Sequence, residues 1–238
     1  MFNFKLILNV LGTLLIALSI LMLIPTLTDL IKSNQTWVSF FIASLFCLGF
    51  GISLFLSTRG DSEGNKLTTK DAFLLTTGSW VVIALFGAIP FYISDFGFSF
   101  TDAIFESMSG VTTTGSTIIT NIEDMSSGIL LWRSLLQWLG GIGIIVMAIS
   151  ILPVLQVGGM QVFRTESSDT SDKILPRTAQ VASAVLSIYI LLTSLCALGY
   201  WIFGMQIFDA MNHSMTTIAT GGFSTRSGSI GAVSYTHL

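Results

Sequence analysis

Two short stretches of this apolar chain are rich in threonine, serine and glycine: TTTGS at residues 112–116 and ATGGF at residues 219–223. Threonine adds a hydroxyl oxygen to its peptide carbonyl, and glycine permits dihedrals that point successive carbonyls the same way. Such oxygens can replace the water shell of a bare monovalent cation. The chemistry that these residue types indicate is therefore cation coordination by main-chain oxygens.

The two stretches belong to a repeat. DAIFESMSGVTTTGST begins at Asp102, DAMNHSMTTIATGGFS begins at Asp209, and six of the sixteen positions agree at a constant offset of 107 residues. Internal repeats recur in membrane transport proteins. The alternative is chance similarity between two biased loops, and the shared order of a long apolar run followed by a short polar run argues against it.

A short helix is expected ahead of each stretch. Ser99 and Asp102 form an S-x-x-D start signal, and Asp209 stands where the second short helix would begin. We expect the helices to end near Val111 and Ile218, so that the partial negative charge of each C-terminus favours a cation. A packed helix interface of small residues is the alternative explanation of either stretch alone.

Membrane helices must position these stretches. The chain of 238 residues is 52% hydrophobic and 10% charged, whereas soluble domains carry roughly 25% charged residues. Five uncharged runs exceed the roughly 20 residues that cross a bilayer as a helix. They are residues 6–28, 33–58, 72–94, 134–163 and 178–208. The uncharged runs 107–122 and 210–225 are too short and polar to span, so we expect them to be re-entrant.

The basic residues predict an orientation. If the five spans alternate and each short run enters and leaves on one side, seven basic residues share the side of the N-terminus and three lie opposite. The seven are Lys5, Arg59, Lys66, Lys70, Arg164, Lys173 and Arg177, and the three are Lys32, Arg133 and Arg226. This bias predicts a cytoplasmic N-terminus, a multi-pass protein and two copies of the repeat in parallel orientation.

Three longer motifs, SMSGVTTTGST, LLWRSLLQWLGGIGIIVMAISILP and TTIATGGFSTRSGSI, resemble the membrane subunit of the Trk/Ktr potassium uptake systems, TrkH type, over nearly the whole chain. The resemblance implies an all-α protein of the bacterial inner membrane, in which two leading transmembrane helices precede four helix–pore-helix–helix repeats with re-entrant filter loops. The implied parts are a leading hairpin at 1–58, a first repeat at 71–153, a cytoplasmic connector at 154–176 and a truncated second repeat at 177–238.

The same resemblance implies potassium uptake through a pore lined by filter carbonyls, with no covalent cofactor and no enzyme activity. The implied filter residues are Thr112, Thr113, Thr114, Gly115, Ser116, Ala219, Thr220, Gly221, Gly222 and Phe223. Potassium ions would be held by the carbonyls of Thr113, Thr114, Thr220 and Gly221. The implied partners are membrane lipid, a second copy in a homodimer of the full-length protein, and a cytoplasmic nucleotide-binding regulatory subunit, but no nucleic acid.

Four loops close the pore in that family and this chain supplies two, so we expect it not to conduct alone. Residues 234–238 do not resemble the expected continuation, so we expect a truncated or misassembled gene product. The residues leave open channel-like flow or symport, and potassium or sodium preference. The alternatives are a secondary transporter that binds its substrate at broken helices and a non-transporting membrane protein. A membrane enzyme lacks support, because the chain carries no catalytic cluster.

Two ionisable residues of the first repeat, Glu106 and Arg133, have alternative interpretations. Glu106, whose counterpart in the second copy is His213, would either attract cations or accept backbone N–H groups behind the filter. His213 is expected to be a hydrogen-bonded interface residue. Arg133 is expected to snorkel to the membrane interface, with the acids Glu123 and Asp124 as alternative partners.

The glycines of WLGGIG, at positions 140, 141 and 143, lie within an uncharged span. We interpret them as sites of close helix packing beside the pore and not as a nucleotide-binding loop.

Overall fold

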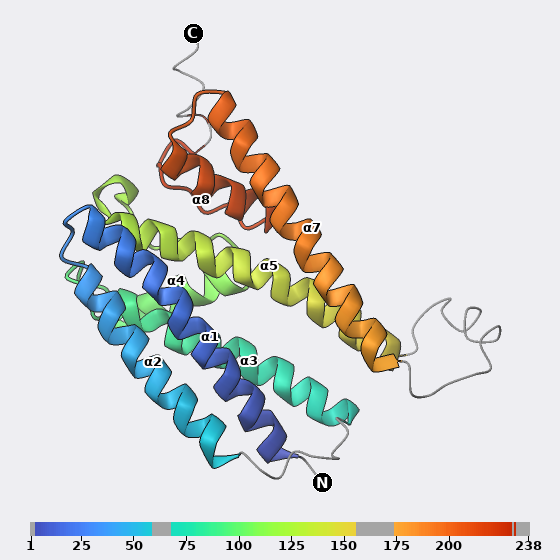
Figure 1. Ribbon diagram of the computed structural model, residues 1–238. Helices are drawn as coiled ribbons and strands as arrows, with labels where there is room; N and C mark the ends of the chain where they lie inside the picture. The colour runs from blue at the N-terminus through green and yellow to red at the C-terminus, as the bar shows by residue number, and fades with distance from the viewer. Residues whose placement is uncertain (1–2, 59–67, 156–173, 230, 232–238) are drawn as a thin grey trace.

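The computed structural model describes residues 3–58, 68–155, 174–229 and 231, and within them the chain is helical with no strand (Figure 1). Five helices are long and two have 12 residues each. The long helices are α1 (Phe4–Ile31), α2 (Trp37–Ser57), α3 (Thr69–Tyr92), α5 (Ser127–Leu155) and α7 (Ile174–Ile202). The short helices are α4 (Phe100–Val111) and α8 (Ile207–Ile218), and a 3-10 turn covers Ile122–Asp124.

All five long helices contain a segment that is long and apolar enough to cross a membrane, which confirms the five expected spans. Two boundaries were predicted wrongly. The fifth run extended to residue 208, but α7 ends at Ile202. The uncharged run placed the start of the fourth span at residue 134, but α5 begins at Ser127 and includes Arg133 as a buried residue. Most of the expected connector, residues 156–173, lies outside the described part of the chain.

Hydrogen bonds between helices define one end of the helix array, where α1 begins. The backbone N–H of Asn3 donates to Asp71 at the start of α3 over 3.0 Å. The side chain of Asn9 donates to Thr58, just beyond α2, over 3.0 Å. The start of α1, the end of α2 and the start of α3 therefore lie together, and we call this the near end.

The opposite, far end is defined by a buried carboxylate. Asp29, close to the end of α1, accepts the N–H of Gly128 in the first turn of α5 over 2.7 Å. The ring of Phe208 in α8 lies 4.1 Å from the ammonium of Lys32. Ser39 in α2 donates to the carbonyl of Ile93 after α3 over 3.2 Å. The chain between α3 and α5, which includes α4, therefore leaves the far end and returns to it.

The core surrounds α5. Trp132 is fully buried, its indole N–H donates to the Gly87 carbonyl of α3 over 2.9 Å, and its ring meets Phe40 of α2 edge-on at 6.2 Å. Buried aromatic pairs of this geometry stabilise packing beyond their area alone. In Figure 1, α5 runs between α8 on one side and α4 on the other.

The short helices end where the sequence predicted, at Val111 and Ile218. Ser99 and Asp102 form the expected capping box of α4, because the Ser99 hydroxyl accepts the Asp102 N–H over 3.2 Å and the Asp102 carboxylate accepts the Ser99 N–H over 3.1 Å. Asp209 lies in the first turn of α8, but its carboxylate binds residues after the helix, as described below.

Candidate ion site formed by two loops

The loops after α4 and α8 have matching backbone conformations. Thr113 and Thr220 both have φ of 56°, and Gly115 and Gly222 have φ of 78° and 80°. A positive φ is uncommon for a β-branched residue and natural for glycine. Positive φ values thus recur at alternate positions in both loops, at the same 107-residue offset as the sequence repeat. This alternation is compatible with successive carbonyls that face one side.

The two short helices also end in the same way. In each, the residue with positive φ donates to the carbonyl three positions back, and the next residue donates to the carbonyl five positions back, which is a Schellman cap. In the first copy the pairs are Thr113–Gly110 at 2.9 Å and Thr114–Ser109 at 3.0 Å, and in the second they are Thr220–Thr217 at 3.0 Å and Gly221–Thr216 at 2.9 Å. Both helices therefore turn sharply into their loops and leave other terminal carbonyls free.

The two loops touch each other. A Cβ atom built on Gly115 would overlap the carbonyl oxygen of Gly221. The glycine of the first loop thus lets the backbone of the second loop approach, which a larger residue would prevent. Neither Gly115 nor Gly222 lies inside a helix, and the predicted filter residues of both copies are brought side by side.

Glycines of α5 allow this helix to approach both short helices. A Cβ on Gly140 would overlap the carbonyl of Val111 at the end of α4, and a Cβ on Gly141 would lie 3.1 Å from Ala219 after α8. The prediction of close packing is confirmed for these two positions. Gly143 has no atom within 4 Å of a built Cβ and makes no such approach.

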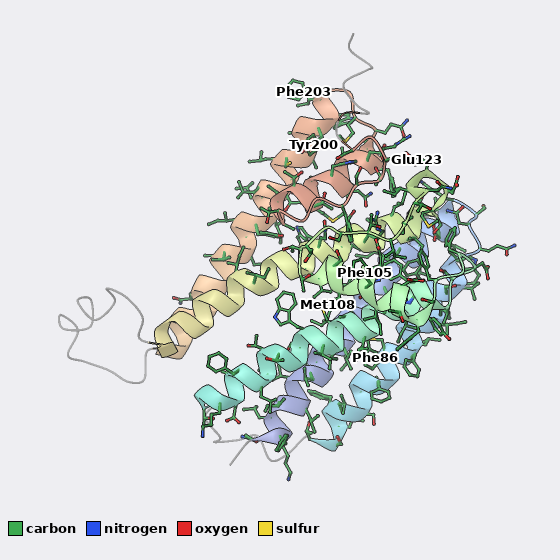
Figure 2. The ribbon with its side chains drawn as sticks, turned by 180° about the vertical axis from the view of Figure 1, so that it is seen from behind. Phe86, Phe105, Met108, Glu123, Tyr200 and Phe203 are labelled. Atoms are coloured by element: carbon green, nitrogen blue, oxygen red, sulfur yellow. The ribbon has the colours of Figure 1, made fainter. Side chains whose placement is uncertain are left out.

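Glu106 holds the first loop from behind. It is fully buried, and it accepts the Thr117 hydroxyl over 2.9 Å and the N–H of Ile118 over 3.1 Å. Of the two interpretations from sequence, the structure supports the one in which Glu106 binds backbone N–H groups. Figure 2 labels Phe105 and Met108 on the same short helix, and Phe105 is one of the exposed hydrophobic side chains.

His213 holds the second loop in the equivalent place. One ring nitrogen lies 2.8 Å from the carbonyl of Asp209, and the other lies 2.9 Å from the hydroxyl of Ser224. Ser224 follows His213 by eleven residues, as Thr117 follows Glu106. The expected hydrogen-bonded interface histidine is therefore found, and its ring also meets Tyr200 of α7 edge-on at 6.4 Å between centroids.

The expectation for Arg133 was wrong, because this residue is only 1% exposed and does not snorkel. Its Nε lies 2.7 Å from a Glu106 oxygen, and a terminal nitrogen donates to the Ser224 carbonyl over 3.1 Å. The guanidinium also stacks 4.1 Å from the centre of the Phe223 ring. A carboxylate buried on α4 attracts the cation inward, so Arg133 connects the first copy to the second.

Gln137 was not identified from the sequence. Its side chain is fully buried on α5, its amide nitrogen donates to the Gly221 carbonyl over 2.9 Å, and its amide oxygen accepts the Phe223 N–H over 3.1 Å. One amide therefore spans Gly222 and binds the peptide groups on both sides. The signal that could have found it is a polar side chain inside an uncharged span, which needs hydrogen-bond partners when buried.

The oxygens of the predicted ion ligands differ in their availability. The Gly221 carbonyl already accepts the Gln137 amide, whereas the carbonyls of Thr113, Thr114 and Thr220 have no hydrogen-bond donor among the described residues. The Thr112 hydroxyl donates to the Met108 carbonyl over 2.8 Å and also lies 2.8 Å from the Thr114 hydroxyl. The main-chain carbonyl oxygens are therefore the groups that are available to coordinate a cation here.

Polar contacts at the far end join the segments that follow the two loops. Asp209 accepts Thr225 over 2.7 Å and forms an ion pair with Arg226 at 3.0 Å. Glu123 accepts the N–H of Ser227 over 2.7 Å and also its hydroxyl, and these bonds lower the pKa of the Glu123 carboxyl. No cluster of three metal-ligating side chains occurs in the described ranges, so the arrangement offers backbone oxygens instead.

Comparisons with known proteins agree with this arrangement. Residues 37–236 match the sequence profile of TrkH, described as a cation transport protein. The chain is 46% identical over 226 residues to the Trk system potassium uptake protein TrkI of Halomonas elongata, covering 95% of this chain and 46% of that protein. It is 42% identical over 232 residues to the Trk system potassium uptake protein TrkH of Escherichia coli K12, covering 96% and 48%.

A solved structure is also similar. The crystal structure of the potassium transporter TrkH from Vibrio parahaemolyticus matches with a TM-score of 0.84 and 40% identity, over 96% of this chain and 46% of that one. The chain thus spans about half the length of the relatives it matches. The family is one of transport proteins and not of enzymes, as predicted, and the resemblance seen in the motifs is confirmed. This chain belongs to the TrkH family of cation transport proteins.

Proposed function

We propose that the full-length protein takes up potassium ions across the bacterial inner membrane, and that the loops after α4 and α8 form half of its selectivity filter. The observation that carries the proposal is the matched pair of loops, with positive φ at Thr113, Gly115, Thr220 and Gly222 and contact between Gly115 and Gly221. Potassium ions would be bound by the carbonyls of Thr113, Thr114 and Thr220, with Gly221 contributing its second lone pair.

In this proposal α4 and α8 are pore helices that enter the membrane from the outer side and return through their loops. The support is that α3 ends and α5 begins at the far end, so that the segment of α4 makes no net crossing. A dry interior tolerates such irregular backbone only where it lines water or an ion. The near end, which carries the N-terminus, would then face the cytoplasm.

The leading hairpin at 1–58, the first repeat at 71–153, the connector at 154–176 and the second repeat from residue 177 are proposed as the parts of this half. A homodimer of the full-length protein and a cytoplasmic nucleotide-binding regulatory subunit are proposed as partners, by resemblance to the family. In this proposal the subunit would meet the near end, where α1 and α3 begin and α2 ends.

Rubidium-86 uptake into proteoliposomes that contain the full-length protein tests the function. We expect uptake that unlabelled potassium suppresses at lower concentration than sodium does. Equal suppression by both ions would contradict a potassium-preferring filter, and absence of uptake in correctly inserted protein would contradict transport itself. Liposomes that contain only residues 1–238 are the control, and we expect no uptake from them, because two loops do not enclose an ion path.

A further inference from the structure

The second loop lacks the internal support that the first loop has. In the first loop the hydroxyls of Thr112 and Thr114 lie 2.8 Å apart and stiffen the turn. The equivalent positions of the second loop are Ala219 and Gly221, which have no hydroxyl. Two adjacent glycines, Gly221 and Gly222, also make this backbone the more flexible of the two.

The Gln137 amide supplies the missing support from another helix. Its donor and acceptor bind the Gly221 carbonyl and the Phe223 N–H, so that both peptide planes next to Gly222 are fixed. A Cβ on Gly221 would collide with this amide, which explains glycine at a position where φ is not positive. In the first loop no side chain binds the equivalent pair of peptide groups. The carbonyl of Thr114 and the N–H of Ser116 have no partner among the described residues.

We propose that Gln137 is a positioning residue that sets the cation preference of the second loop. The proposal rests on the filter function proposed above. An ion that replaces its water shell with carbonyls is sensitive to the directions of those dipoles. Gln137 fixes these directions at Gly221 and Gly222 without itself contacting the ion. Without Gln137, the peptide groups at Gly221 and Gly222 can rotate. The distance between the carbonyl oxygens of Thr220 and Gly222 is then no longer fixed.

The test replaces Gln137 in the full-length protein by methionine, which has a similar volume and no amide. The matched control is Ser134→Ala, which removes a buried hydroxyl of the same helix. Among the described residues this hydroxyl bonds only the Leu130 carbonyl of its own helix. The readout is the ratio of potassium to sodium permeability from reversal potentials in planar bilayers. The free energy of one neutral hydrogen bond corresponds to about a fivefold change in an equilibrium constant. We therefore expect Gln137→Met to lower the potassium-to-sodium permeability ratio by about fivefold or more. Ser134→Ala should leave this ratio unchanged.

Gln137→Asn is the second variant if the first does not fold, because it stays neutral and keeps an amide but shortens the side chain by one methylene group. The shorter amide cannot reach both the Gly221 carbonyl and the Phe223 N–H, so we expect the permeability ratio to fall in the same direction. A wild-type permeability ratio in every Gln137 variant that folds would overturn the role of Gln137 and leave the filter function standing. Wild-type protein that conducts no potassium would instead overturn the proposed function.

Discussion

Glu106 and His213 occupy equivalent places 107 residues apart, and each binds the hydroxyl of the residue eleven positions later, Thr117 or Ser224. The two side chains hold their loops with the same geometry but with different chemistry. A carboxylate buried at this depth needs a cation, and Arg133 provides it at 2.7 Å. A histidine needs none, which is why the second copy can bind its loop without a second arginine at this point.

Removal of the Glu106 charge should destabilise the protein strongly. Glu106→Gln leaves Arg133 buried without its counter-charge, and the loss of one partner from a buried pair costs about 3–5 kcal/mol. The melting temperature of the full-length protein in detergent measures the effect. The control is Asp95→Asn at an exposed carboxylate, where we expect a change within about 0.5 kcal/mol.

The double variant Glu106→Gln with Arg133→Met distinguishes an uncompensated charge from lost packing. Replacement of both charges removes the cost of the unpaired cation, so the double variant should be more stable than Glu106→Gln alone. A double variant as unstable as the sum of the two single variants would show that the ion pair has no coupling energy.

The two filter glycines should differ in their tolerance of alanine. Gly222→Ala introduces only a side chain at φ of 80°, because the space around it is open, and the left-handed region costs about 1–2 kcal/mol for a non-glycine residue. Gly115→Ala has the same strain and also overlaps the Gly221 carbonyl. We expect rubidium uptake to fall in both variants and further in Gly115→Ala.

Gly49→Ala is the control for this pair, because Gly49 is exposed on α2 with no atom near a built Cβ. Membrane insertion, measured by the yield of monodisperse protein, should be unaltered by Gly49→Ala and Gly222→Ala. Equal uptake by all three variants would show that the loop conformations do not govern transport.

Features that depend on local sequence were predictable in this chain. The spans follow from runs without charge, and the capping box at Ser99 and the loop after Val111 fix the ends of α4. Contacts over long sequence distances were not. Arg133 and Glu106 lie 27 residues apart, and no spacing rule joins them. Gln137 meets a loop 84 residues away, and its partners are backbone groups that carry no sequence signature.

Alanine at Gly140 should displace the first short helix from α5. Its Cβ would overlap the Val111 carbonyl, which is backbone and cannot rotate away, whereas a Cβ on Gly141 would lie 2.5 Å from the Tyr189 hydroxyl, a movable side-chain atom. We therefore expect Gly140→Ala to lower both the melting temperature and rubidium uptake more than Gly141→Ala does. Overpacking of this kind typically costs about 1–3 kcal/mol. A greater loss in Gly141→Ala would indicate that α8, and not α4, is the more tightly packed against α5.

Glu123 should make the link between the segments that follow the two loops sensitive to acid. The Ser227 hydroxyl and N–H lower the pKa of this carboxyl from its ordinary value of 4.5. A lowered folded pKa means that the bonds stabilise the protein above the ordinary value and that this contribution is lost as the pH falls through the folded value. Between about pH 5 and pH 3, the melting temperature of wild-type protein should therefore fall more steeply than that of Glu123→Gln. Other carboxylates titrate equally in both proteins, so the difference between the two curves isolates Glu123. Ser227→Ala, which keeps the N–H and loses the hydroxyl, should give an intermediate slope, and parallel curves for wild type and Glu123→Gln would contradict the link.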